Sequence, residues 1–150
     1  MEKKMNNKGF SLVELIIVVA IMAVLIGVLA PAYLQYVEKS KKTTDCTAVG
    51  DIMNAIETIA ADPAITWSDI TVQITSTGAV YTGDPTNAAG DGCLESIVPA
   101  ADVALTGTWT GGSFDFTATK GANGIVTFTI NSGIATTEID EISPALSNRF

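Results

Sequence analysis

The pattern of hydrophobic residues changes character twice along the chain. After Glu14, the 23 residues from 15 to 37 carry no charge and are mostly apolar on every side, a length and polarity that can span a bilayer as a helix. Between Val49 and Ala60 the apolar residues recur at i, i+3, i+4 and i+7, the period of an amphipathic helix. We interpret both stretches as one helix that leaves the membrane and begins to pack against a domain near Thr43.

This predicted helix has an expected end and an expected weak point. It ends at Ala61, because the residue before a proline is pushed out of helical geometry and Asp62 precedes one. Inside it, Pro31 removes a backbone hydrogen bond and its ring presses on the carbonyl of Gly27. We therefore expect a kink or a locally unwound segment from Gly27 to Pro31.

Residues 63–150 read as short strands and turns. Apolar side chains alternate with polar ones in runs that predict strands with one buried face: Ile70, Val72 and Ile74; Phe114, Phe116 and Ala118; Val126, Phe128 and Ile130. A short strand is expected at 79–81 and a loop at 83–92. Strands at 105–110 and 113–119 flank a Gly-Gly hairpin signal, and the tail from 137 to 150 has no firm assignment.

The fold class that follows is α+β. A long kinked N-terminal helix spans the membrane and then packs its amphipathic half against three to five antiparallel strands, whose apolar face covers the stripe from Val49 to Ala60. Trp67 and Trp109 are expected in this core or against the sheet, the alternative being a carbohydrate-binding surface.

Charge and composition narrow the range of functions. The chain has 150 residues, a formal net charge of −8 and no histidine, so imidazole catalysis and histidine metal sites are excluded. From Thr43 onward two basic residues stand against thirteen acidic ones, so no general nucleic-acid binding is expected. No nucleophile–base pair, phosphate loop or zinc spacing is present. The sequence predicts no enzyme, no metal site and no cofactor.

Two further groups of residues leave alternatives open. Cys46 and Cys93 are even in number, so outside the membrane they are predicted to form a disulfide that ties the loop at 83–92 to the helix; the alternative is two buried thiols. Lys39, Lys41 and Lys42 follow the apolar stretch directly. They are a solvated turn of helix, or contacts to lipid phosphates, or contacts to acidic neighbours in an assembly.

The basic N-terminus leads into Gly9-Phe10-Ser11-Leu12-Val13-Glu14. This stretch resembles the processing motif of type IV prepilins, and the resemblance covers about residues 6 to 45. It implies that a prepilin peptidase cuts between Gly9 and Phe10 and that Phe10 is N-methylated. It implies further that Glu14 pairs with the terminal amine of a neighbouring copy. Gly27 and Pro31 lie where the family's helix can melt on assembly.

The resemblance also implies an organisation and a function. Residues 1–9 are a cleaved leader, 10–37 a transmembrane and filament-core helix, 38–62 its amphipathic half and 63–150 an extracellular β-rich head. The chain would be a single-pass membrane protein that joins a helical homo-oligomer, a type IV pilus, through the pilus assembly machinery. Within the same family, a type II secretion pseudopilin or a competence pilin for DNA uptake are alternatives.

A protein of another class also fits part of the pattern. An exported binding module with a conventional signal peptide would be cut after residues 30–32, Ala-Pro-Ala, before Tyr33. Glu14 argues against this alternative, because a charge is unwanted at the start of a signal peptide's apolar region.

Overall fold

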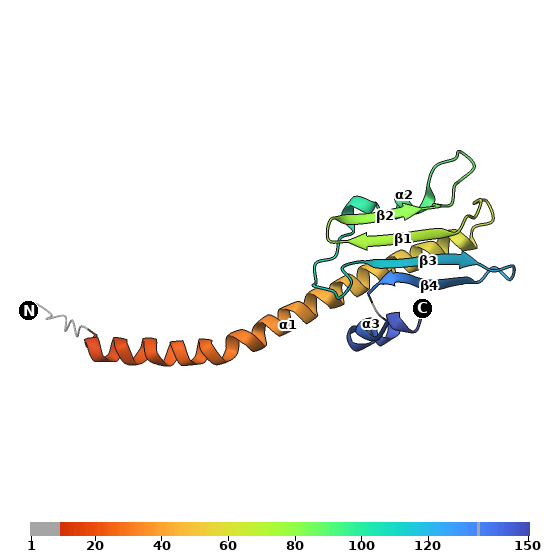
Figure 1. The fold of residues 1–150 in the computed structure, drawn as a ribbon. Coiled ribbons are helices and arrows are strands. Elements are labelled where there is room, and N and C mark those ends of the chain that lie inside the picture. Colours follow the sequence, from red (N-terminus) through yellow and green to blue (C-terminus); the bar gives the residue numbers. More distant parts are fainter. Residues whose placement is uncertain (1–9, 135) are drawn as a thin grey trace, which may run out of the picture. The chain divides into compact units, whose positions relative to one another are not determined.

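The structure is a computed structural model that describes residues 10–134 and 136–150. It confirms the α+β class, and its elements follow one another as shown in Figure 1. They are α1 (Leu12–Ala61), β1 (Ile70–Thr75), β2 (Gly78–Thr82), α2 (Cys93–Ile97), the 3-10 helix η1 (Ala100–Asp102), β3 (Phe114–Lys120), β4 (Val126–Gly133), α3 (Thr136–Ile142) and α4 (Pro144–Ser147). Two compact units result, one reaching to Val37 and one from Glu38 to Phe150.

Helix α1 begins and ends close to where the sequence predicts. It stops at Ala61, one residue before Asp62, whose own carboxylate accepts a hydrogen bond from the Ala64 N–H at 2.8 Å and so begins the following turn. Pro31 lies inside the helix and the backbone around it stays helical. Local unwinding from Gly27 to Pro31 is therefore absent from this structure, and melting of this part of the helix on assembly stays a prediction.

The four strands form one antiparallel sheet in the order β2-β1-β3-β4. Val72 of β1 lies opposite Phe116 of β3, and Phe116 lies opposite Ile130 of β4 beyond a register shift next to Asp115. This register puts the predicted apolar positions on one face, which covers the second half of α1 (Figure 1). The predicted helix stripe is buried as expected: Val49, Ile52, Met53, Ile56, Ile59 and Ala60.

The predicted hairpin around Gly111-Gly112 is wrong. Residues 105–110 form no strand, because the backbone N–H groups of residues 106, 107, 108 and 110 donate to carboxylates of the helices, as described below. Gly112 instead donates to the Trp109 carbonyl at 3.2 Å in a turn. The hairpin that does form joins β3 to β4.

The tail from 137 to 150, which the sequence left unassigned, packs against the core. It folds into α3 and α4, and its last two residues reach back to the sheet and to α1. The Phe150 ring lies 5.6 Å from the Phe116 ring in an edge-to-face contact. Arg149 pairs with Glu57 of α1 at 2.6 Å and lies over the Phe128 ring.

Candidate functional site

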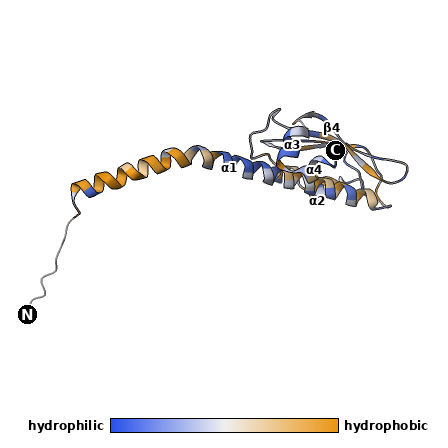
Figure 2. Cartoon of the chain, turned by 90° about the horizontal axis from the view of Figure 1, so that it is seen from below, coloured by the Kyte–Doolittle hydropathy of each residue, from blue (hydrophilic) through white to orange (hydrophobic). Residues whose placement is uncertain are grey.

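The largest unusual surface of the chain is the first half of α1. Every residue from Phe10 to Tyr36 is exposed, and the exposed fraction of its large apolar side chains runs from 42% at Val18 to 84% at Phe10. Figure 2 shows this stretch as the most continuously hydrophobic part of the chain. An apolar surface of this extent marks contact with lipid or with other protein, and α1 is long and apolar enough to cross a membrane.

The carboxylate at the start of this surface has a partner that the sequence analysis missed. Glu14 accepts a hydrogen bond from the Ser11 N–H at 2.9 Å, and the Ser11 hydroxyl oxygen accepts one from the Val13 N–H at 3.4 Å. This reciprocal arrangement is a capping box, in which Ser at the N-cap and Glu three residues later satisfy the helix's first N–H groups. The Ser-x-x-Glu spacing was the signal that could have found it.

The other predicted residues of this region stand as follows. Gly9 lies outside the described residues, so the cleavage site is a prediction. Phe10 is fully described and highly exposed. Gly27 meets no atom within 4 Å of the position a Cβ would take, so in the isolated chain nothing packs against it. Pairing of Glu14 with a neighbour's amine needs a second copy and stays a prediction.

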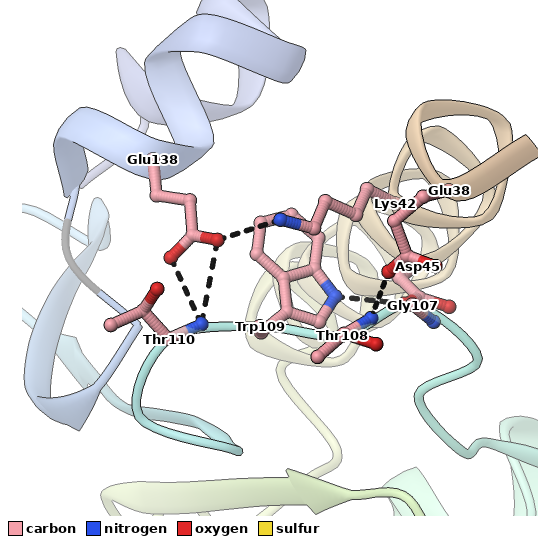
Figure 3. A network of polar contacts seen from close by, with 8 residues as sticks. All are labelled: Glu38, Lys42, Asp45, Gly107, Thr108, Trp109, Thr110 and Glu138. Carbon is pink, nitrogen blue, oxygen red and sulfur yellow. Dashed lines mark hydrogen bonds and ion pairs between the residues drawn. The ribbon is translucent and has the colours of Figure 1, made fainter. Parts of the chain in front are cut away.

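In the head, a buried carboxylate of α1 organises the segment before β3. Asp45 is 3% exposed. It accepts hydrogen bonds from the Thr106 N–H at 2.9 Å and the Thr106 hydroxyl at 2.8 Å. It also accepts from the Gly107 N–H and the Trp109 indole N–H, each at 2.8 Å (Figure 3). Four donors compensate the desolvation of one buried charge.

The close approach of this segment requires a glycine. A Cβ on Gly107 would lie 2.8 Å from the Lys42 Cγ and 3.1 Å from a carboxylate oxygen of Asp45. Contacts that short would push the segment away from α1, so only glycine lets its backbone reach the Asp45 carboxylate.

Two more carboxylates hold the same segment, as Figure 3 shows. Glu38 accepts a hydrogen bond from the Thr108 N–H, and this bond holds the pKa of Glu38 below its usual value. Glu138 of α3 accepts from the Thr110 N–H at 3.2 Å and pairs with Lys42 at 2.8 Å. The Lys42 ammonium also lies 5.0 Å from the centre of the Trp109 ring.

These contacts form one unit, which we call the base anchor: Glu38, Lys42 and Asp45 of α1, residues 106–110 and Glu138. It ties three parts of the chain that are distant in sequence at the end of the head where α1 enters. Its carboxylates accept hydrogen bonds from backbone N–H groups of the same chain, and Lys42 pairs with Glu138. The base anchor is therefore a structural device.

The predicted disulfide is not formed. Both thiols are free, with Cys46 buried and Cys93 half-buried. Burial raises the pKa of Cys46 to about 11, and the Asp45 charge adds to this effect; burial also raises the pKa of Cys93, followed by the Asp84 charge. Gly92, next to Cys93, pairs with Thr86, and Thr86 pairs with Thr66 just beyond the C-terminal end of α1. Cys46 lies about 24 Å from that end at 1.5 Å per residue, well beyond the reach of a disulfide.

A lysine binds the C-terminal end of α1, at the opposite end of the head from the base anchor. Lys120 donates to the Ala60 carbonyl at 2.6 Å and lies over the Trp67 ring, where a cation suits the C-terminal end of a helix. Trp109 is buried and Trp67 packs partly against the core, as expected. Among the described residues, no group of three or more His, Cys, Asp or Glu side chains is placed to hold a metal ion.

Comparison with known proteins adds to this geometry. Residues 4–30 match the model of the prokaryotic N-terminal methylation motif. The chain is 32% identical to prepilin peptidase-dependent protein A of Clostridium perfringens over 108 residues, which are 71% of this chain and 77% of that protein. It is 28% identical to fimbrial protein EcpC of Eikenella corrodens over 133 residues, which are 80% of this chain and 87% of the relative.

A third similarity is confined to a shorter region. The chain is 39% identical to the type IV major fimbrial protein FimA of Dichelobacter nodosus over 59 residues, 39% of this chain and 38% of FimA. No solved structure matches the chain.

Proposed function

This chain belongs to the type IV prepilin-like proteins, and from that premise we propose that it is a structural subunit of a type IV pilus. The subunit waits in the membrane as a single-pass protein and then enters a helical filament of identical copies at the cell surface. Such a fibre would serve adhesion, twitching motility or biofilm formation. The fimbrial relatives support the pilus over a secretion pseudopilus or a DNA-uptake fibre.

The observation that carries the proposal is the exposed apolar half of α1. All residues from Phe10 to Tyr36 are exposed. In the precursor the bilayer surrounds this stretch, and in the filament the same stretch of neighbouring copies replaces the lipid. Dispersion and close packing among helices then hold the fibre together.

Processing by a prepilin peptidase is the second part of the proposal. The enzyme cuts between Gly9 and Phe10, and the new amine of Phe10 is methylated. The methylation motif at 4–30 and the similarity to a prepilin peptidase-dependent protein support this step. Cutting there leaves the capping box of Ser11 and Glu14 at the very start of the mature helix.

One experiment tests assembly and processing together. Fibres sheared from cells are examined by electron microscopy, and the intact mass of their subunit is measured. The expected mass is that of a chain starting at methylated Phe10. A chain starting at Tyr33 would identify a conventional signal peptide, and absence of fibres that depend on this protein would contradict the pilus subunit. The variant Gly9→Val should accumulate as an uncut membrane precursor.

A further inference from the structure

The head carries opposite charges at the two ends of its part of α1. At the base, where the head begins, Lys39 and Lys41 are exposed. Lys42, which the sequence groups with them, is used inside the subunit by Glu138. Among the described residues two ion pairs form, Lys42 with Glu138 and Arg149 with Glu57. Neither Lys39 nor Lys41 forms one with a described residue, although the charge of Lys41 acts on the nearby Glu38.

At the distal end, where α1 stops, several carboxylates gather. Asp62 follows the helix directly, and the bridges from Thr66 to Thr86 and from Thr86 to Gly92 bring Asp91 towards the turn that follows the helix. Asp69 lies near the same end, because the Trp67 indole N–H donates to it and the Lys120 ammonium over the Trp67 ring donates to the Ala60 carbonyl of α1. We call the exposed members Asp62, Asp69 and Asp91 the distal rim.

The carboxylates of the distal rim are held in place and have spare acceptor capacity. Asp62 accepts from the Ala64 N–H at 2.8 Å and Asp69 from the Trp67 indole N–H at 3.3 Å. Neither forms an ion pair within the described residues. A carboxylate has about four acceptor positions, so each of them can also receive an ammonium group from outside.

We propose that the helix face around Lys39 and Lys41 docks the distal rim of a second copy of this chain. The inference rests on the proposed function, because a filament built on N-terminal helices places all copies in the same direction. The base of one head then lies above the distal end of another. Lys41 and Asp62 are separated by 21 positions, about 32 Å at 1.5 Å per residue, which is the axial offset at which the two ends meet.

Charge complementarity selects this occupant over lipid phosphate. Within the membrane Lys39 and Lys41 follow the apolar stretch and can reach the headgroups, but a subunit that has entered a fibre has no phosphates beside it. In the fibre the distal rim of a second copy offers these lysines a group of acidic partners. Opposite charges attract at this axial offset, whereas other offsets bring like charges together and are disfavoured. The contact therefore selects one axial stagger of the heads.

The test is a charge reversal with rescue in the full chain, in cells. Lys39→Glu with Lys41→Glu should lower the yield of sheared fibres about tenfold, because like charges then face each other. The level of subunit in the membrane should not change. Adding Asp62→Lys and Asp91→Lys to the same chain should bring the fibre yield back to within about twofold of the original, since the attraction is restored with its sign inverted.

The matched control moves the same charge elsewhere. Asp102→Lys with Asp140→Lys changes the net charge equally, at exposed positions of η1 and α3, and it should not rescue the lysine reversals. Rescue by this control as well would show that only net charge matters and would overturn the proposal. Normal fibre yield from the lysine reversals would overturn it too, while leaving the pilus subunit intact.

The membrane alternative has its own outcome. If the lysine reversals lower the amount of subunit in the membrane and the distal reversals do not restore it, Lys39 and Lys41 serve lipid phosphates and the proposal is overturned. If the unaltered chain forms no fibres, the proposed function fails and the docking contact fails with it.

Discussion

The two halves of helix α1 are both rich in apolar residues, yet they lie in opposite surroundings. In the first half, side chains such as Ile21 and Leu25 are more than half exposed, at 56% and 54%. In the second half, Ile52 and Ile56 are fully buried under the sheet. The second half finds its partner in its own chain, because its apolar residues form a stripe that one sheet can cover. The first half is apolar on all sides, so its partner is outside the chain.

The two halves also use carboxylates differently. Asp45 in the second half accepts four hydrogen bonds from a segment of its own chain. Glu14 in the first half accepts one, from its neighbour Ser11, and keeps acceptor capacity for another subunit. A buried charge that is satisfied internally stabilises one fold, whereas a charge left partly satisfied favours a partner that completes it.

The largest effect is expected from removing that incomplete charge. Glu14→Leu should insert into the membrane and be processed normally, yet lower the yield of sheared fibres at least about tenfold, because the predicted ion pair with the neighbour's amine could not form. Glu14→Asp should give an intermediate yield, since its carboxylate is one methylene shorter. Fibre yield is compared with the membrane level of each variant. A normal yield of fibres from Glu14→Leu would contradict a role in assembly and leave Glu14 with the role of a helix cap.

The second largest effect is expected in the head, at Asp45. Asp45→Ala leaves the Thr106 and Gly107 N–H groups and the Trp109 indole without an acceptor, and it should lower the free energy of unfolding by about 3 kcal/mol. Urea unfolding of the chain in detergent micelles, followed by tryptophan fluorescence, measures this loss. The control is Asp51→Ala, an exposed carboxylate on the same helix, for which a change of at most about 0.5 kcal/mol is expected.

A smaller loss is expected at the C-terminal tail. Phe150→Ala removes the edge-to-face contact with Phe116 from a half-buried position, and it should cost about 1–2 kcal/mol in the same urea measurement. Asn148→Ala, an exposed neighbour in the tail, serves as the control. Equal stability of both variants would show that the tail does not contribute to the core.

The smallest effect concerns pH at the base anchor. The pKa of Glu38 is held below its ordinary value of 4.5, first by the Thr108 N–H and further by the charges of Lys41 and Lys42. A lowered folded-state pKa means that this stabilisation is complete above pH 4.5 and is lost as the pH falls through the lower folded value. The Thr108 amide should therefore open more often as the pH falls through this range, which hydrogen exchange measures as a loss of protection.

The matching controls sharpen this pH experiment. The Thr66 amide, which donates to the Thr86 carbonyl at 3.0 Å, has no titrating acceptor and should open independently of pH in this range. Glu38→Gln should remove the acid-dependent step at Thr108. A step that persists in Glu38→Gln would assign it to another carboxylate of the base anchor.

Comparison of prediction and structure shows which kinds of signal are local. The helix end before Pro63, the buried stripe from Val49 to Ala60 and the alternating strand positions were predicted correctly, because each depends on spacing within a few residues. The strand at 105–110 and the bridge between Cys46 and Cys93 were predicted wrongly. In both cases residue type permitted the structure, but contacts to distant parts of the chain decided otherwise.

The sequence by itself determined that one long helix passes from an all-round apolar stretch to an amphipathic one, and that strands follow it. Hydrophobic periodicity carries that information, since it states which faces must be removed from water. Only the tertiary structure decided that Asp45 is buried, that residues 106–110 lie against α1 and that the tail ends on Phe116. These features depend on groups that are far apart in the sequence: the Phe116 and Phe150 rings are 34 residues apart, and Thr106 and Trp109 are 61 and 64 residues from Asp45.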